Sequence, residues 1–376
     1  MIVRELKLRN FRNHADSTVT LGSGINALLG ENGQGKTNVL EAVSFLGLTK
    51  SFYASSDVDV LKFGTDFFSI EGLVEADGGS TSAIRVVYRK NPSDKQITVN
   101  ALSPESHSRM IGRFPVVVLS PEHARITWGG PVERRKFMDL TLSQVSASYL
   151  DDLFDYRRAL RQRNRLLFEA KTGTRGVVSQ IEPWTEHLAA SGGRIIARRL
   201  SFIEEFASYV TAAYAMLVDG KEQPSMQYAP LPGVVSGMSS EECARHLTDE
   251  LHRRALDELR RAATLAGPHR DDIDFSLDGM LVQKFASQGQ HKTLLVALKL
   301  AEHQYVFERC NERPMLLLDD LFSELDAPRA ARILDRIRTI GQTIVTTTEE
   351  TPFHGSVGWD NTNRKYFVRH GTIFEA

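Results

Sequence analysis

The chain has 376 residues, of which 41% are apolar, and it carries 46 basic side chains against 47 acidic ones. This length and apolar content allow a sizeable core and predict two lobes. A net charge of −1 excludes a uniformly basic surface, so any surface for a polyanion has to come from local clustering of charges. The two cysteines, Cys243 and Cys310, lack the spacing of a disulfide framework or a metal site and fit a reducing, cytoplasmic compartment.

No run of 18 apolar residues occurs, and charged residues within the first nine positions leave no hydrophobic signal segment. We therefore expect a soluble protein with no membrane partner.

The first section, residues 1–130, alternates strand-like segments with turn signals. Apolar alternation at 2–8 predicts a half-buried strand, and similar segments follow at 18–21, 68–74, 83–89 and 96–100. Turn residues at 77–79 and 91–94 separate the last three segments, which predicts an antiparallel meander. The apolar run 116–119, followed by Pro121, predicts a buried strand.

A glycine-rich segment within this section matches the phosphate-binding pattern G-x-x-x-x-G-K-[ST]. Its residues are Gly30, Glu31, Asn32, Gly33, Gln34, Gly35, Lys36 and Thr37. An apolar run at 25–29 predicts a strand entering the segment, and apolar residues at three- and four-residue steps after Lys36 predict a helix leaving it. Backbone N–H groups of such a loop point at phosphates, Lys36 would reach the β and γ phosphates, and Thr37 would place its hydroxyl on Mg²⁺. The sequence therefore predicts a nucleotide site at the start of this helix.

Residues 131–266 change to arginine-rich sequence with helical apolar spacing at 149–170, 184–216 and 240–265. Few strand signals occur here, so we expect an inserted, mainly helical lobe. Strand and helix signals alternate again in 267–376, with a hairpin turn at 278–279, a helix at 290–307 and a central strand at 315–318. A helix at 328–340, a strand at 343–347 and a terminal strand pair at 366–368 and 372–374 complete the predicted elements.

Two carboxylates, Asp319 and Asp320, stand where the predicted central strand ends. Open α/β sheets hold their ligands at this edge. Asp319 is the candidate ligand for the Mg²⁺ that bridges nucleotide phosphates, and Asp320 is the candidate for orienting the attacking water. Just before the helix at 290–307, a hydroxyl and backbone N–H groups offer a second phosphate contact or, alternatively, only a helix cap. These residues are Ser287, Gln288, Gly289 and Gln290.

Together these pieces resemble the ABC-type ATPases of chromosome maintenance, and specifically the bacterial RecF family. Segments 8–13, 30–41, 133–139, 267–272, 285–290 and 317–326 carry the resemblance, which covers nearly the whole chain. It implies an α/β fold: an ABC-type P-loop ATPase lobe, with a mixed sheet, helices and the antiparallel meander, interrupted by the helical lobe. It also makes residues 287–290 the signature motif, which acts in trans, Asp326 part of the D-loop, and 346–348 the segment near the switch position.

The resemblance further implies a slow, DNA-stimulated ATPase that forms an ATP-dependent head-to-tail homodimer. Such a dimer uses ATP and Mg²⁺, binds double-stranded DNA beside single-strand gaps, and helps RecA loading with RecO and RecR in recombinational repair, linked to replication and the SOS response. Threonine rather than histidine near the switch favours slow turnover. Arg12 is the candidate adenine contact, whereas His14 and Tyr53 depart from the family pattern, and no glutamine marks the Q-loop at 119–122.

Clustered arginines could contact DNA phosphates without reading sequence, although each cluster also fits a solvated helix face. The leading candidates are Arg157, Arg158 and Arg161, followed by Arg163, Arg165, Arg194, Arg198, Arg199, Arg253, Arg254, Arg260 and Arg261. Alternative functions are a transporter ATPase subunit, an SMC-like ATPase without a repair role, and an ATPase with an attached nuclease. The helical insert between Lys36 and Ser287 disfavours the transporter, and no nuclease-like metal cluster stands outside the ATPase motifs.

Overall fold

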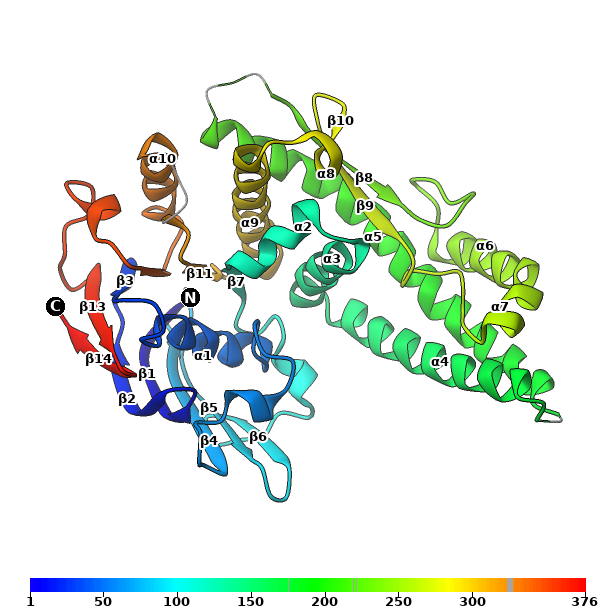
Figure 1. Ribbon diagram of the computed structural model, residues 1–376, viewed down its shortest axis with the longest axis horizontal. Helices are drawn as coiled ribbons and strands as arrows, with labels where there is room; N and C mark the ends of the chain where they lie inside the picture. The colour runs from blue at the N-terminus through cyan, green and yellow to red at the C-terminus, as the bar shows by residue number, and fades with distance from the viewer. Residues whose placement is uncertain (175, 219, 221, 323–326) are drawn as a thin grey trace. The chain divides into compact units, whose positions relative to one another are not determined.

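The computed structural model describes residues 1–174, 176–218, 220, 222–322 and 327–376. The chain divides into two compact units (Figure 1). The first unit comprises Met1–Ala124, Ala212–Lys221 and Lys292–Ala376, and the second comprises Arg125–Thr211 and Glu222–His291. The predicted division into an ATPase lobe (1–130 and 267–376) and an inserted helical lobe (131–266) stays a prediction.

The first unit contains a six-stranded sheet in the order β14-β13-β3-β12-β11-β7. Its strands are β3 (Ile25–Leu29), β7 (Val116–Leu119), β11 (Met315–Asp319), β12 (Thr343–Thr347), β13 (Arg364–Arg369) and β14 (Thr372–Glu375). All pairings are parallel except that of β13 with β14. Every residue of β3, β7, β11 and β12 is buried, as expected for strands of a sheet covered on both faces.

The predicted meander is a second, antiparallel sheet in the order β2-β1-β4-β5-β6. Its strands are β1 (Ile2–Phe11), β2 (His14–Thr20), β4 (Phe67–Glu75), β5 (Thr81–Arg89) and β6 (Asp94–Val99). Helix α1 (Lys36–Leu48) contacts strands of both sheets (Figure 1). Phe45 of this helix packs edge-on against Phe11 and Phe68, with ring centroids 5.8 and 5.7 Å away. This aromatic group packs α1 against the antiparallel sheet, since Phe11 and Phe68 lie on β1 and β4.

The remaining helices of the first unit are η1 (Asp57–Val60), η2 (His107–Met110), η3 (Pro121–Ala124), most of α9 (Gln288–Cys310), α10 (Ala327–Ile337) and η6 (Thr351–Phe353). Helix α9 carries a long buried stripe that includes Leu294, Leu298 and Tyr305, as the apolar spacing predicted.

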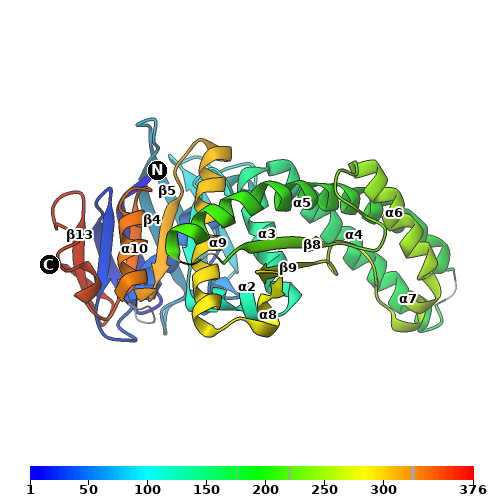
Figure 2. The ribbon, with the colours of Figure 1, turned by 90° about the horizontal axis from the view of Figure 1, so that it is seen from above.

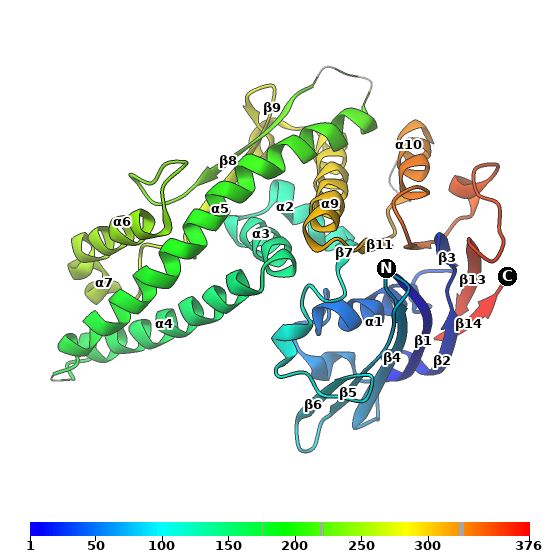
Figure 3. The ribbon, with the colours of Figure 1, turned by 180° about the vertical axis from the view of Figure 1, so that it is seen from behind.

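The second unit is built mainly from helices. They are α2 (Arg125–Trp128), α3 (Pro131–Val145), α4 (Ala147–Lys171), η4 (Val178–Gln180), α5 (Ile181–Leu217), α6 (Ser240–Arg253), α7 (Ala255–Arg261) and α8 (Val282–Phe285). Helices α4 and α5 lie side by side (Figure 3), and Leu166, Leu167 and Ile181 form an apolar cluster where they meet. The last residues of α5 belong to the first unit.

The helical insert contains one strand that the sequence did not predict. This strand, β8 (Pro224–Ala229), pairs with β9 (Asp272–Leu277) (Figure 2), and β9 pairs with β10 (Met280–Leu281), which makes a three-stranded sheet. Strand β8 escaped prediction because it is short, begins with proline and contains polar residues at partly exposed positions. The helical spacing at 240–265 belongs to two helices: α6 ends at Arg253, and α7 ends at Arg261, before Ala262, which adopts a left-handed conformation.

Candidate functional site

The glycine-rich loop joins β3 to α1 in a conformation that requires glycine. Gly30, Gly33 and Gly35 have φ angles of 152°, 79° and 110°. A Cβ atom at Gly30 would lie 2.5 Å from the Val368 carbonyl oxygen, and one at Gly35 would lie 2.5 Å from Asn13 Oδ1. These positive φ angles and close approaches explain the glycines, and they leave the first N–H groups of α1 at the end of a loop shaped for an anion.

Two residues far apart in the chain meet beside this loop. The Thr37 hydroxyl donates a hydrogen bond to Asp319 Oδ1 over 2.7 Å, across 282 positions of sequence. The Thr346 hydroxyl donates to the same oxygen, also over 2.7 Å, and accepts from the backbone N–H of Asp320 over 2.9 Å. The structure thus brings together both residues that the sequence proposed as Mg²⁺ ligands. A hydroxyl and a carboxylate are hard oxygen donors, which fits Mg²⁺.

Burial shifts the pKa of Lys36 downward and the pKa of Asp319 upward. Lys36 Nζ donates to the carbonyl oxygens of Gly30 and Glu31 over 2.6 and 2.9 Å. Burial lowers the pKa of Lys36, against the attraction of Asp320 and Asp319. Burial also raises the pKa of Asp319, although the hydrogen bonds from Thr346 and Thr37 oppose this shift. A phosphate or cation that compensates these buried charges would therefore be bound favourably.

Two hairpins, β1–β2 and β13–β14, contact the loop through hydrogen bonds that the sequence did not predict. From the first, Asn13 Nδ2 donates to the Gln34 carbonyl over 2.9 Å, and His14 Nε2 lies 3.1 Å from the Gly35 carbonyl. From the β13–β14 turn, the N–H of Gly371 donates to the Gln34 carbonyl over 2.9 Å, and the N–H of His370 donates to Gln34 Oε1 over 2.6 Å. No local pattern could have revealed these contacts, because each pairs residues distant in sequence.

Arg12, the candidate adenine contact, has a firmly held side chain. Its guanidinium makes two hydrogen bonds to the Glu41 carboxylate, both 2.8 Å, and a third to the Asp59 carbonyl, also 2.8 Å. It also lies 5.9 Å from the ring centroid of Tyr53. The ion pair with buried Glu41 explains why an arginine is needed at this position, and its role toward adenine stays a prediction.

The signature segment belongs to the second unit and begins α9. The Ser287 hydroxyl accepts from the Gln290 N–H over 3.2 Å, while Gln290 Oε1 accepts from the Ser287 N–H over 2.8 Å. Gln290 Nε2 also donates to Glu222 over 2.9 Å. Ser287 is thus a helix cap, which is the structural alternative that the sequence left open. Asp326, the D-loop candidate, lies outside the described residues.

Burial divides the arginines of the helical insert into two groups. Arg157, Arg158 and Arg161 are exposed on α4, with Arg157 3.6 Å from Asp139. Arg163 and Arg199 are 3% and 2% exposed, so their inclusion among the DNA candidates was wrong. Both are arginines that neutralise buried carboxylates, a role that the spacing of arginines along a helix cannot distinguish from a solvated face.

Arg199 is the centre of a buried polar cluster in the second unit, which we call the Arg199 cluster. Its guanidinium donates to Asp139 over 2.7 Å, to the Pro268 carbonyl over 2.7 Å and to the Tyr149 hydroxyl over 3.0 Å. Asp271 lies 3.6 Å away, and burial raises its pKa to about 6 although Arg199 opposes the shift. The cluster links segments 133–139 and 267–272, which the resemblance had highlighted without a stated role.

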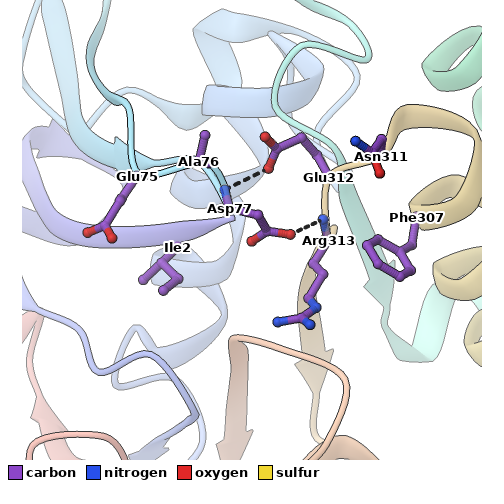
Figure 4. A pocket seen from close by; sticks show the side chains of 9 residues that line it. Ile2, Glu75, Ala76, Asp77, Phe307, Asn311, Glu312 and Arg313 are labelled. Atoms are coloured by element: carbon purple, nitrogen blue, oxygen red, sulfur yellow. Dashed lines mark hydrogen bonds between the residues drawn. The ribbon is translucent and has the colours of Figure 1, made fainter.

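The first unit also contains a cavity of about 610 Å³ away from the glycine-rich loop (Figure 4). The Asp77 N–H donates to Glu312 over 2.9 Å, and the Arg313 N–H donates to Asp77 over 2.9 Å. Glu75 adds a third carboxylate to its lining, against one arginine. Arg4 pairs with Glu75 and the amino-terminal ammonium of Met1 pairs with Asp77, so these carboxylates already have partners within the chain.

Comparison with known proteins places the chain in a family. The family model described as RecF/RecN/SMC N terminal domain matches residues 2–373. The chain belongs to the RecF family. Its relatives include the DNA replication and repair protein RecF of Chloroherpeton thalassium, 42% identical over 354 residues that cover 93% of this chain and 95% of that protein. RecF of Salinibacter ruber is 40% identical over 356 residues, covering 94% and 86% of the two chains.

Solved structures agree with this family and confirm the predicted ABC-type ATPase fold. The recombination mediator protein RecF of the RecFOR pathway, in structures with ATP and with ATPrS, matches with a TM-score of 0.91 and 30% identity, and the match covers all of this chain. It covers 97% of the chain in the structure with ATP and 98% of the chain in the structure with ATPrS. An Smc head bound to part of ScpA matches with a TM-score of 0.56 and 13% identity, over 100% of this chain and 97% of that one, which shows a shared fold. No helix among the described residues is long and apolar enough to span a membrane.

Proposed function

We propose that the protein is an ATP-dependent DNA-binding protein of recombinational repair and replication. In this proposal ATP joins two copies head to tail, the dimer binds double-stranded DNA beside single-strand gaps, and slow, DNA-stimulated hydrolysis releases it. RecO and RecR are its expected partners in helping RecA to load, and the reducing cytoplasm is its expected location. Membership of the RecF family supports this function over that of a transporter subunit.

The observation that carries the proposal is the contact between Thr37 and Asp319, because it joins the glycine-rich loop to the acidic end of β11. Backbone N–H groups of the loop would bind the phosphates, and Lys36 would exchange its two carbonyl partners for β- and γ-phosphate oxygens. Thr37 and Asp319 would hold Mg²⁺, which when bound neutralises charge on the β and γ phosphates. Asp320 would orient the attacking water.

The γ-phosphate also needs contacts from the opposite side, and we assign these to a second copy. Ser287 to Gln290 would present a helix start to the nucleotide held by the partner, and Asp326 would contact the same interface. ATP then contributes affinity between the copies, and loss of the γ-phosphate shifts the population toward separated copies. Threonine rather than histidine stands near the switch position, and Thr346 there donates a hydrogen bond to Asp319, which supports slow turnover.

One experiment tests the dimer and the DNA role together. Mass in solution and binding to a gapped duplex are measured with and without ATP for the native protein, Lys36→Met and Ser287→Arg. We expect ATP to double the mass and strengthen DNA binding for the native protein only, with Ser287→Arg still binding ATP. A native protein that stays monomeric at saturating ATP, and binds gapped DNA equally with or without it, would contradict the proposal.

The DNA-contact assignment has its own test. Arg158 and Arg161 are exposed, and neither has an ion-pair partner among the residues described. Reversing both to glutamate is expected to weaken duplex binding and lower the salt dependence by about one to two phosphate contacts, with ATP binding intact. The matched control reverses Lys7 and Arg85, two exposed cations of the meander. Equal losses in both double variants would refute the assignment.

A further inference from the structure

The β13–β14 hairpin presents an exposed aromatic pair next to the glycine-rich loop. Phe367 of β13 lies directly opposite Phe374 of β14 in the antiparallel register. Their exposed fractions are 37% and 51%, whereas Tyr366 and Val368 point into the core. Side chains alternate along a strand, so both phenylalanines share the outward face. A hollow of about 470 Å³ is lined by Phe367, Arg369, His370, Thr372 and Phe374.

Cations flank this aromatic pair on the same face. Lys365 and Arg369 stand two residues before and after Phe367 on β13, so they project outward with it. Lys365 Nζ lies 6.0 Å from the Phe367 ring centroid and pairs with Glu350 over 2.7 Å. Arg369 is exposed and has no carboxylate partner within the described part of the chain. The face therefore combines two aromatic rings with an unneutralised cation.

The hairpin is also held in place before any ligand binds. Its turn donates two backbone hydrogen bonds to Gln34, from His370 over 2.6 Å and from Gly371 over 2.9 Å. Gly371 has a φ of 74°, and a Cβ atom there would collide with the backbone of Asn13. A surface fixed in this way loses little conformational entropy on binding.

We propose that this face binds a short stretch of single-stranded DNA, with an unpaired base stacked on Phe367 and Phe374 and a phosphate at Arg369. Aromatic rings beside cations form platforms on which the bases of single-stranded DNA stack, while the cations contact the phosphates. Paired bases are already stacked within a duplex, so only unpaired bases can use the rings. The proposal deepens the proposed function by naming a contact for the gap strand.

The test measures binding of an oligothymidine that contains one 2-aminopurine, whose fluorescence falls on stacking. The native protein is expected to quench it, and Phe374→Ala is expected to weaken binding about tenfold, by loss of one stacked base. Phe374→Trp is expected to retain binding. Arg369→Gln is expected to lower the salt dependence by about one phosphate contact. Phe63→Ala, which removes another exposed aromatic of the first unit, is the matched control and is expected to change nothing.

The outcomes separate this site from its rivals and from the proposed function. Failure of the native protein to quench the oligonucleotide, or equal losses in Phe374→Ala and Phe63→Ala, would overturn the site. If Phe374→Ala leaves oligonucleotide binding intact but abolishes the ATP-dependent increase in mass, the face joins two copies and the proposal is also overturned. The proposed function fails separately, through absence of ATP-dependent binding to gapped duplex, and that result leaves the oligonucleotide titrations interpretable.

Discussion

Each unit contains a buried polar cluster with a cationic side chain at its centre. The cluster of the second unit stabilises the fold, whereas that of the first unit is suited to binding a ligand. In the second unit, all three nitrogens of Arg199 donate to groups of the chain: Asp139, Tyr149 and the Pro268 carbonyl. In the first unit, Lys36 donates only to carbonyls of its own loop, beside backbone N–H groups arranged for an anion. A cluster whose donors are satisfied internally stabilises the fold, whereas one whose bonds a ligand can replace is suited to binding. The difference gives a series of tests.

The largest expected effect is on stability, from Arg199→Met. Removing this guanidinium leaves buried Asp271 without the cation that lies 3.6 Å away and removes the shorter of two arginine contacts to Asp139, which costs about 3–5 kcal/mol in free energy of unfolding. Urea denaturation followed by circular dichroism measures it. Arg158→Met on exposed α4 is the control and should change stability by less than about 0.5 kcal/mol. Similar losses in the two variants would mean that the Arg199 cluster does not stabilise the second unit.

The next effect is on the pH dependence of stability, to which Asp271 and His269 contribute with opposite signs. Burial raises the pKa of Asp271 to about 6, so the folded state keeps a proton that the unfolded chain has lost. Its contribution to stability therefore falls as pH rises from about 4 to 6. Burial lowers the pKa of His269 to about 4, so the unfolded chain is the better proton acceptor. Its contribution rises as pH rises from about 4 to 6.5.

Two variants separate these contributions. Relative to the native protein, Asp271→Asn should gain stability as pH rises across this window, and His269→Gln should lose it, each by on the order of 2 kcal/mol. Urea midpoints at several pH values measure both slopes. Parallel slopes in the native protein and both variants would show that neither group titrates in this window.

A smaller effect, on binding, is expected from Thr37→Val. The substitution keeps the shape of the side chain but removes the hydroxyl that contacts Asp319, so ATP affinity in Mg²⁺ should fall about tenfold. Titrations in Mg²⁺ and in EDTA measure the metal-dependent part. Thr346→Val removes the other hydroxyl on Asp319 and should affect the metal-dependent part less. An equal loss in EDTA would argue against Thr37 as a metal ligand.

The same contrast explains what the sequence could predict. The loop and the apolar run of β11 carry strong local patterns, so the loop, the strand and the position of Asp319 at its end were predictable. The burial of Arg199 was not, because its hydrogen-bond partners lie up to 69 positions away and an arginine on a solvated helix has the same spacing. The hairpin contacts to Gln34 were hidden for the same reason. Strand β8 was missed because its pairing with β9, rather than its own composition, makes it a strand.

The smallest expected effect is on ATP affinity, from a residue of the β1–β2 hairpin that contacts the glycine-rich loop. His14 is fully buried, and its ring lies 3.1 Å from both the Gly35 carbonyl and the Ser17 hydroxyl. His14→Phe keeps the burial but removes both contacts, so we expect ATP affinity to fall about threefold to tenfold, equivalent to one hydrogen bond of about 1 kcal/mol. Ser17→Ala is the control, because Ser17 contacts His14 and Gly371 but not the loop itself. Suppose that both variants lose ATP affinity equally and unfold at the native urea midpoint. The contacts between the two hairpins, rather than His14 alone, would then hold the loop, and the binding site of the first unit would depend on internal hydrogen bonds as the Arg199 cluster does.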